Sequence, residues 1–389
     1  MQRWPAVLTR DAIKARARAL GFDLCGVAPV DSHPELSFLS EWLNRGYAGT
    51  MTWMEQTAQR RADVRAILPT ASTVIVTGTY YNTLPAQEGP AEAGPHDSNG
   101  PTEAGPYDSN GPAEAGPYEP SVGADFSRPA TATIARYAWG DDYHHVLQAR
   151  LDALLAWMQE QTVEPFEARA FVDGGPVQER VYAQYAGLGW IGKNTCLINP
   201  ERGSWLFLGE IICSLPLEAD TQGLEQCGSC TRCIEACPTD ALVEAGVLDA
   251  NRCLSYLTIE LRDSIPVGYR AALGAQVYGC DICQAVCPYN EAQPGSTDPA
   301  WQPRPGLDRP PLLDLWRQSD DELRALMKGT AMTRAKLPGV RRNVAVAIGN
   351  SGDADAVAAL AVPYPDRPSV DDPMVQEHVD WALTKNSKL

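Results

Sequence analysis

Eight of the eleven cysteines of this 389-residue chain lie between residues 227 and 287. The first half of this stretch reads C-G-S-C-T-R-C-I-E-A-C-P from Cys227 to Pro238, a complete C-x2-C-x2-C-x3-C-P run. In proteins with two 4Fe–4S clusters, three thiolates of such a run bind one cluster and the fourth binds the neighbouring cluster. The second half, C-D-I-C-Q-A-V-C-P, lacks its first cysteine, because Val277 stands at that position. Cys253 is the only nearby thiol that can replace it.

These cysteines divide into two sets of four. The predicted ligands of one cluster are Cys227, Cys230, Cys233 and Cys287, and those of the other are Cys237, Cys253, Cys280 and Cys283. Zinc is the alternative, since C-x2-C pairs also suit tetrahedral zinc. Zinc sites usually show two separated pairs, whereas here three cysteines at successive spacings of three precede Cys-Pro. The spacing therefore favours two iron–sulfur clusters.

A run of polar residues, D-D-Y-H-H from Asp141 to His145, could supply acid–base chemistry. It lies between a predicted strand that starts at Thr131 and a predicted helix through about Gln159, and functional groups commonly emerge at such junctions. A carboxylic acid in a low-dielectric pocket has a raised pKa and can deliver a proton to a leaving oxygen. The alternative is that Asp141 or Asp142 only caps the helix. One of the two can cap while the other does chemistry.

Alternating strands and helices across residues 1–226 predict an α/β domain with a mixed sheet. Thr9 is expected to cap the first helix and Gly21 to end it. Pro176 is expected in the first turn of a later helix, and the glycines of Ala186–Thr195 allow close backbone approach to a large ligand. The predicted strands besides the one at Thr131 are Phe22–Val27, Thr73–Thr77, Phe166–Asp173 and Trp205–Ile212.

Residues 86–120 differ from the rest of the chain. They form three tandem copies of an eleven-residue unit rich in Gly, Pro and acidic residues. Such a tract cannot bury enough apolar surface to offset its ordering entropy, so we expect a disordered loop insertion. Residues 227–290 form the predicted ferredoxin-like domain. Residues 291–389 are predicted to contain a linker and a HEAT-like helical repeat, which cannot be stable alone and must dock on the rest.

The net charge of −17 argues against a general nucleic-acid binder, because phosphate contacts need clustered Lys and Arg. The segment 327–343 is an exception, since it has no acidic residue. Either it binds phosphates or it is an ordinary solvated helix face. Its basic residues are Lys328, Arg334, Lys336, Arg341 and Arg342.

The N-terminus has no apolar signal core, and no apolar run is long enough to span a bilayer. We therefore expect a cytoplasmic protein with reduced thiols. Cys25, Cys196 and Cys213 fit no ligand pattern and lie in apolar contexts. They are interpreted as buried small hydrophobic residues.

Several stretches together resemble the epoxyqueuosine reductase family. They are R-Y-A-W-G-D-D-Y-H-H-V-L, D-G-G-P-V-Q-E-R, G-L-G-W-I-G-K-N-T, the double-cluster spacing and R-R-N-V-A-V-A-I-G-N-S-G-D, and they span nearly the whole chain outside residues 86–120. The resemblance implies a cobalamin-dependent iron–sulfur oxidoreductase, related in design to reductive dehalogenases. Such an enzyme reduces the epoxide of epoxyqueuosine to the cyclopentene of queuosine at the wobble position of tRNA.

The resemblance also implies roles for particular residues. The family's catalytic acid, the Asp of G-x-D-Y-H, falls on Asp142. The basic segment 327–343 would bind tRNA phosphates, and electrons would come from an external low-potential donor such as a flavodoxin or ferredoxin to a cytoplasmic monomer. A ferredoxin-type electron-transfer protein and a reductive dehalogenase acting on small organohalides remain the alternatives. The candidates for lining the cobalamin pocket are Asp173, Lys193, Asn194 and Thr195.

Overall fold

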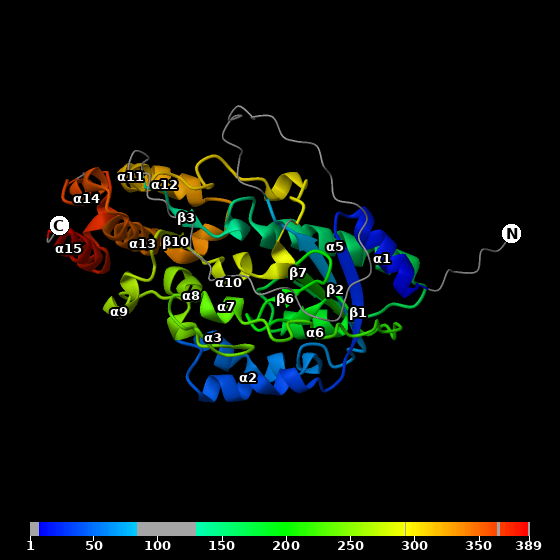
Figure 1. Cartoon of the computed structure of the whole chain (residues 1–389). Coiled ribbons are helices and arrows are strands. Elements are labelled where there is room, and N and C mark those ends of the chain that lie inside the picture. Colours follow the sequence, from blue (N-terminus) through cyan, green and yellow to red (C-terminus); the bar gives the residue numbers. More distant parts are fainter. Residues whose placement is uncertain (1–7, 84–129, 292, 364–365, 388–389) are drawn as a thin grey trace, which may run out of the picture.

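The computed structural model describes residues 8–83, 130–291, 293–363 and 366–387. An N-terminal α/β part, a central part that carries the clustered cysteines and a group of C-terminal helices follow one another along an elongated molecule (Figure 1). The repeat insertion predicted at residues 86–120 lies outside the described residues. Within the described ranges no helix is long and apolar enough to cross a bilayer.

The largest sheet has four strands in the order β1-β2-β7-β4, and each neighbouring pair is antiparallel. The prediction of a mixed sheet is therefore wrong for this sheet. Connections that contain helices can return the chain in either direction, so the alternation of helices and strands did not decide the pairing. The strands are β1 (Leu24–Pro29), β2 (Thr73–Tyr80), β7 (Leu206–Cys213) and β4 (Ala168–Phe171).

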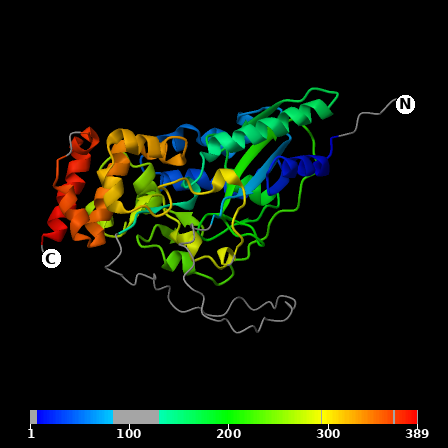
Figure 2. The same ribbon diagram turned by 90° about the horizontal axis from the view of Figure 1, so that it is seen from above.

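Helices cover both faces of this sheet (Figures 1 and 2). Because side chains alternate along a strand, Phe207 and Ile211 of β7 pack with α1 and α5, whereas Leu208 and Ile212 pack with α6. Glu210 has the same parity as Leu208 and therefore points toward α6. The covering helices are α1 (Arg10–Ala19), α5 (Tyr143–Gln161), α2 (Pro34–Asn44), α4 (Ala58–Ala62) and α6 (Glu179–Tyr185).

Two of the predicted helix ends can be compared directly with the structure. The Thr9 side chain accepts a hydrogen bond from the Ala12 amide and caps α1, and Gly21 follows that helix with a φ of 89°. Both predictions are confirmed. The prediction for Pro176 is wrong, because α6 begins at Glu179. The D-G-G-P-V-Q stretch first forms a turn that carries Asp173 with a φ of 52°.

The cysteine-rich part consists of short elements joined by loops. It contributes β10, which pairs in parallel with β3 (Thr133–Ile134) from the strand-to-helix junction before α5. One apolar core then includes residues of β3, β10 and the C-terminal helices. The short elements are α7 (Arg232–Glu235), β8 (Leu242–Glu244), β9 (Val247–Leu248), α8 (Leu254–Ile259), α9 (Val267–Arg270), β10 (Gln276–Tyr278) and α10 (Ile282–Ala285).

The C-terminal helices pack around α13, which lies against α15 (Figure 1). Gly352 ends α13 with a φ of 72°, and the Asp353 side chain caps α14. The predicted helix pair and its turn are therefore present, while a HEAT-type repeat stays a prediction. The helices are α11 (Leu312–Arg317), α12 (Asp320–Met327), α13 (Lys336–Ser351), α14 (Ala354–Leu360) and α15 (Pro373–Asn386).

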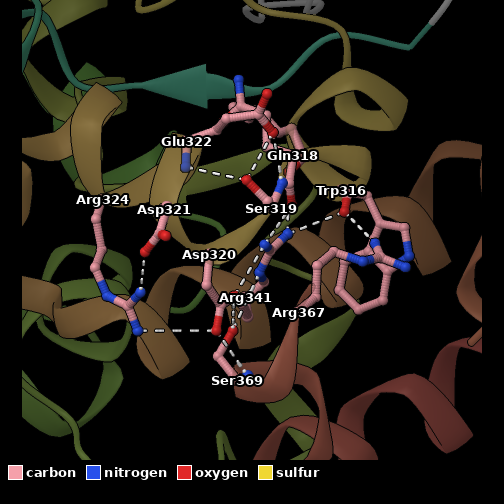
Figure 3. Close-up of polar contacts among 11 residues, drawn as sticks. Trp316, Gln318, Ser319, Asp320, Asp321, Glu322, Arg324, Arg341, Arg367 and Ser369 are labelled. Atoms are coloured by element: carbon pink, nitrogen blue, oxygen red, sulfur yellow. Dashed lines mark hydrogen bonds and ion pairs between the residues drawn. The ribbon is translucent and has the colours of Figure 1, made fainter. Parts of the chain in front are cut away.

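Two arginines of the basic segment lie inside this helical core. Arg341 and Arg342 are 0% exposed. Arg341 donates to the Trp316 carbonyl at 2.9 Å and forms an ion pair with Asp320 at 3.2 Å (Figure 3). Arg342 donates to the Leu257 carbonyl at 2.6 Å. The expectation that these two arginines bind phosphates is therefore wrong, because burial and saturated hydrogen bonding make them structural.

Candidate functional site

The catalytic candidate Asp142 lies at the N-terminus of α5. Its side chain accepts a hydrogen bond from the His144 amide at 3.1 Å, so Asp142 caps the helix. Its own amide donates to the Gly329 carbonyl at 2.9 Å, which fixes the junction against the loop after α12. Asp141 is 55% exposed and lies 3.8 Å from Arg304. Of the two aspartates, Asp142 therefore caps the helix, and its catalytic role stays a prediction.

A histidine lies between two carboxylates beside this cap. His144 Nδ1 donates to Asp142 Oδ1 at 2.7 Å, and Nε2 donates to Asp173 Oδ2 at 3.3 Å. Burial alone lowers the pKa of His144, but the hydrogen bonds to these two aspartates raise it to about 9. His144 is therefore an imidazolium at neutral pH.

The hydrogen bond from His144 lowers the pKa of Asp142. Burial opposes this effect but is smaller, so the pKa stays below its ordinary value. This is opposite to the raised pKa expected for a catalytic acid in an apolar pocket. The physical reason is the charged neighbour, because an imidazolium at hydrogen-bonding distance favours the carboxylate. The transferable proton of the pair consequently resides on His144.

Asp173 completes the polar site. Its Oδ2 accepts a hydrogen bond from the Tyr143 hydroxyl at 2.7 Å, and its amide donates to Glu179 Oε1 at 2.6 Å. Burial raises the pKa of Asp173, but the hydrogen bonds from His144 and Tyr143 lower it below its ordinary value. The Asp173 side chain is 59% exposed, so this carboxylate reaches the open part of the site.

The two predicted cysteine sets stay a prediction, although some of their thiols from distant segments lie near one another: Cys227 packs against the apolar cluster that contains Cys287, and Cys253 and Cys280 pack against one apolar cluster. Cys287 lies within electrostatic range of Cys227 and Cys233, although it follows them by more than fifty positions. Cys280 lies within the same range of Cys253 and Cys237. Among the described residues no three such ligands converge closely enough to hold a metal ion, so the assignment of four thiols to each cluster stays a prediction.

Cys196 is placed differently from the prediction. Its thiol lies beside Cys283 of the second set, and it is half-buried rather than part of an apolar core. Cys213, by contrast, is buried in the core on the α5 face of the sheet, as predicted. The spacing of cysteines could not reveal the place of Cys196, because the loop that carries it reaches the cluster region only in the folded chain.

The predicted cobalamin-pocket residues occupy two different environments. Lys193 Nζ donates to the carbonyls of Gly228 and Cys230, at 2.6 Å and 3.0 Å. Asn194 is 3% exposed and donates to the Cys283 carbonyl at 3.3 Å. These two side chains hold loops of the cysteine-rich part, and their role in a cobalamin pocket stays a prediction.

Thr195 lies on the side of the active-site carboxylates. Its carbonyl accepts a hydrogen bond from Arg180 at 2.7 Å, and Arg180 acts electrostatically on Asp173. Thr195 and Asp173 both have a positive φ, of 65° and 52°, so two turns of unusual backbone border the same region. The role of Thr195 and Asp173 in a cobalamin pocket stays a prediction.

The fold and the site define an iron–sulfur oxidoreductase with an acid–base group next to its redox centres. The family model described as "4Fe-4S double cluster binding domain" matches residues 226–290, and the one described as "Epoxyqueuosine reductase QueG, DUF1730" matches residues 113–174. The epoxyqueuosine reductase of Gloeobacter violaceus is 41% identical over 357 residues, covering 90% of this chain and 99% of that protein. That of Xanthomonas campestris is 37% identical, covering 96% and 95%.

Solved structures that are similar to this chain belong to the same kind of enzyme as these relatives. A crystal structure of epoxyqueuosine reductase with an epoxyqueuosine-modified tRNA-Tyr stem loop has a TM-score of 0.78 and 26% identity, covering 96% of this chain and 89% of that one. The Streptococcus thermophilus epoxyqueuosine reductase has a TM-score of 0.77 and 27% identity, covering 97% and 90%. The chain belongs to the epoxyqueuosine reductase family.

The activity of the chain is the reduction of epoxyqueuosine in tRNA to queuosine. The double-cluster family model over residues 226–290 gives the chain two 4Fe–4S clusters. The ferredoxin alternative is set aside, because the match to these enzymes covers the α/β part as well as the cysteine-rich part.

Proposed function

We propose that Asp142 and His144 together deliver the proton that the epoxide oxygen needs when its bond to carbon breaks. When bound, the clusters and cobalamin supply the electrons. Asp142 is 14% exposed and accepts the short hydrogen bond from His144, so a proton can move along this bond as negative charge develops on the substrate oxygen. Asp173 holds the other nitrogen of the ring and keeps the imidazolium oriented.

The hydrogen-bonded arrangement of Asp142, His144 and Asp173 carries this proposal. A lone carboxylate with a lowered pKa is a poor acid, whereas a carboxylate paired with an imidazolium has a proton at hand. The test is Asp142→Asn in the reconstituted enzyme, with cluster and cobalamin content measured beside turnover. Retained cofactors with lost turnover support the proposal, and full turnover would remove Asp142 from the mechanism.

The two cysteine sets suggest an order for electron transfer. Gly228 and Ser229 in the first set's loop are exposed, which suits entry of electrons from an external low-potential donor such as a flavodoxin or ferredoxin. The second set lies next to Cys196, and the neighbouring Thr195 contacts Arg180 beside Asp173. Electrons would leave the second set toward a cobalamin lined by Thr195 and Asp173, with Lys193 and Asn194 supporting the cluster loops. We propose that the enzyme works as a cytoplasmic monomer.

The exposed part of the basic segment is proposed to bind tRNA near the wobble nucleoside. Lys328, Arg334 and Lys336 are exposed, whereas the two arginines of the helical core are not. Lys328 precedes Gly329, whose carbonyl accepts the hydrogen bond from the Asp142 amide. The basic surface therefore begins next to the proposed proton donor. Arg334 is held by an ion pair with Glu260 at 2.8 Å, which leaves the two lysines as the main candidates.

A further inference from the structure

A carboxyl group lies inside the sheet behind the active site. Glu210, on β7, is paired with Val76 of β2 and Phe171 of β4 and is 0% exposed. Within the described part of the chain, neither of its carboxyl oxygens has a hydrogen-bond donor in suitable geometry. An ionised carboxylate in such a place is strongly disfavoured unless it is paired, so Glu210 is expected to hold a proton.

The neighbour of this carboxyl is a second glutamate. Glu179 is the first residue of α6, the helix that packs on this face of β7, and its charge acts on Glu210. Two ionised carboxylates that face each other repel, so a proton on one of them relieves the repulsion. Burial, and then the Asp173 charge, raise the pKa of Glu179 to about 8. Burial, and then Glu179, raise the pKa of Glu210 well above its ordinary value.

Charged groups on the neighbouring elements do not neutralise this pair. Arg61 from α4 and Arg180 from α6 favour the charged form of Glu179, but Asp173 opposes them. The Arg61 guanidinium donates to the Val177 carbonyl, and Arg180 donates to the Thr195 carbonyl. Both arginines are therefore engaged elsewhere by hydrogen bonds.

The glutamate pair joins the active site through Asp173. The Asp173 amide donates to Glu179 Oε1 at 2.6 Å, and the Asp173 carboxylate accepts from Tyr143 and His144. His144 in turn donates to Asp142 at 2.7 Å. Polar contacts thus run from Glu179 to the proposed proton donor, and Glu210 lies behind Glu179 on the same face of the sheet.

The reaction consumes protons, which the enzyme must supply. Conversion of an epoxide to an alkene breaks both carbon–oxygen bonds and releases the oxygen as water, which consumes two electrons and two protons. The Asp142–His144 pair holds one transferable proton at neutral pH. The second must come from another group or from solvent.

We propose that Glu179 and Glu210 share a stored proton that passes by Asp173 and His144 to Asp142 during each turnover. A water molecule between the Glu179 and Asp173 carboxyls would complete the path. The two glutamates do not touch the substrate and are positioning and proton-supplying residues. This inference rests on the proposed role of Asp142, but the presence of the stored proton does not.

The first experiment therefore uses the full chain without substrate or turnover. Infrared difference spectra across a pH titration should contain the carbonyl band of a protonated carboxylic acid at pH 7. Glu210→Gln should remove that band, and the matched control Glu35→Gln should keep it. Glu35 is a half-buried carboxyl that also contacts α6, through Gln184 and Tyr185. Absence of the band at pH 7, or its survival in Glu210→Gln, would overturn the proposal.

The second experiment measures turnover of the reconstituted enzyme with saturating tRNA. Glu210→Gln and Glu179→Gln should each lower kcat by at least about tenfold with little change in KM. They should also increase the solvent deuterium isotope effect, because proton resupply becomes limiting. An unchanged kcat and isotope effect in both variants, with Glu35→Gln as control, would refute the relay. If the infrared band is present but Asp142→Asn remains active, the proposed donor fails and the stored proton stands.

Discussion

Ionisable side chains are buried in two regions of the protein, and their hydrogen bonding differs between the two. In the C-terminal helical core, Arg341 and Arg342 are fully buried, and carbonyl oxygens accept hydrogen bonds from both. In the α/β part, Glu210 is equally buried, yet no donor among the described residues satisfies either of its oxygens. A buried arginine whose donors are all hydrogen-bonded links the helices around it. A buried carboxyl group without hydrogen-bond donors is instead expected to be protonated.

The difference shows how chemistry and stability can be told apart in this chain. The arginines have hydrogen-bond partners that are mainly backbone groups, which do not titrate. The site around Asp142, by contrast, links residues whose partners are themselves titratable. A change of protonation at one of them therefore alters the pKa of the next; they are Asp142, His144, Asp173 and Glu179. Substitutions of the buried arginines should therefore lower stability, whereas substitutions in the titratable site should lower turnover.

The largest effect is expected at Asp142. Asp142→Asn should lower turnover by roughly 100-fold or more, because a general acid contributes about 10²–10⁴ to the rate. Asp141→Asn is the matched control, since Asp141 is 55% exposed and lies 3.8 Å from Arg304. Turnover of reconstituted enzyme on epoxyqueuosine-containing tRNA gives the comparison. Equal losses in the two variants would contradict the assignment.

The next effect concerns folding rather than turnover. Arg341→Ala should lower the free energy of unfolding by about 3–5 kcal/mol, because buried backbone carbonyls and the buried Asp320 carboxylate lose the donor that Arg341 supplies. Arg65→Ala is the control, since the ion pair of Arg65 with Asp63 lies at the surface and should contribute little. Urea unfolding measures both.

The third prediction concerns tRNA affinity, which should depend on the exposed lysines of the basic segment and not on its buried arginines. Lys328→Glu with Lys336→Glu should weaken binding of tRNA and reduce the slope of log K against log salt by about 2, because each lysine is expected to neutralise one phosphate. Arg18→Glu on α1, at the far end of the molecule in Figure 1, is the control for a charge reversal remote from this surface, with half the change in net charge. Binding isotherms at several salt concentrations are the measurement. Unchanged affinity in the lysine variant would move the tRNA surface elsewhere.

The smallest effect is the pH dependence of stability from His144. Its pKa in the folded protein, about 9, lies above the ordinary value of 6.5. The ion pairs therefore contribute fully below pH 6.5, and this contribution is lost as the pH rises through 9. Because His144 is 40% exposed, solvent screening keeps the contribution below about 1 kcal/mol. The difference in unfolding free energy between the wild type and His144→Gln should shrink over that range.

The matched variant for this last prediction is His145→Gln, since the His145 side chain is 84% exposed. Its stability relative to the wild type should vary little over the same pH range. A difference for His144→Gln that grows from pH 6.5 to 9 would contradict the raised pKa.

The clearest sequence predictions were those that depend on local chemistry. Cysteine spacing predicted a double iron–sulfur cluster region before the fold was known, and the family model over residues 226–290 confirms that coarser prediction. Thr9 and Gly21 mark the ends of α1 by their own backbone preferences. Asp142 could be located as a helix cap beside a histidine, but the sign of its pKa change required the position of the His144 ring.

Glu210 could not be found in this way. In sequence it is one polar residue in the apolar run L-F-L-G-E-I-I-C, and nothing nearby marks its partner. Glu179 meets it only because α6 packs on that face of β7. The same limit applies to Arg341, whose buried position depends on helices from both sides of it in the chain.

By itself, the sequence determined which residues can bind iron–sulfur clusters, where the acidic helix cap lies and which family the motifs resemble, because these features depend on residue type and short spacing. The tertiary structure alone decided which charges are exposed, which carboxyls meet and that the sheet is antiparallel. Those outcomes depend on contacts between segments far apart in the chain, and desolvation and hydrogen bonding in such contacts set the protonation of each group.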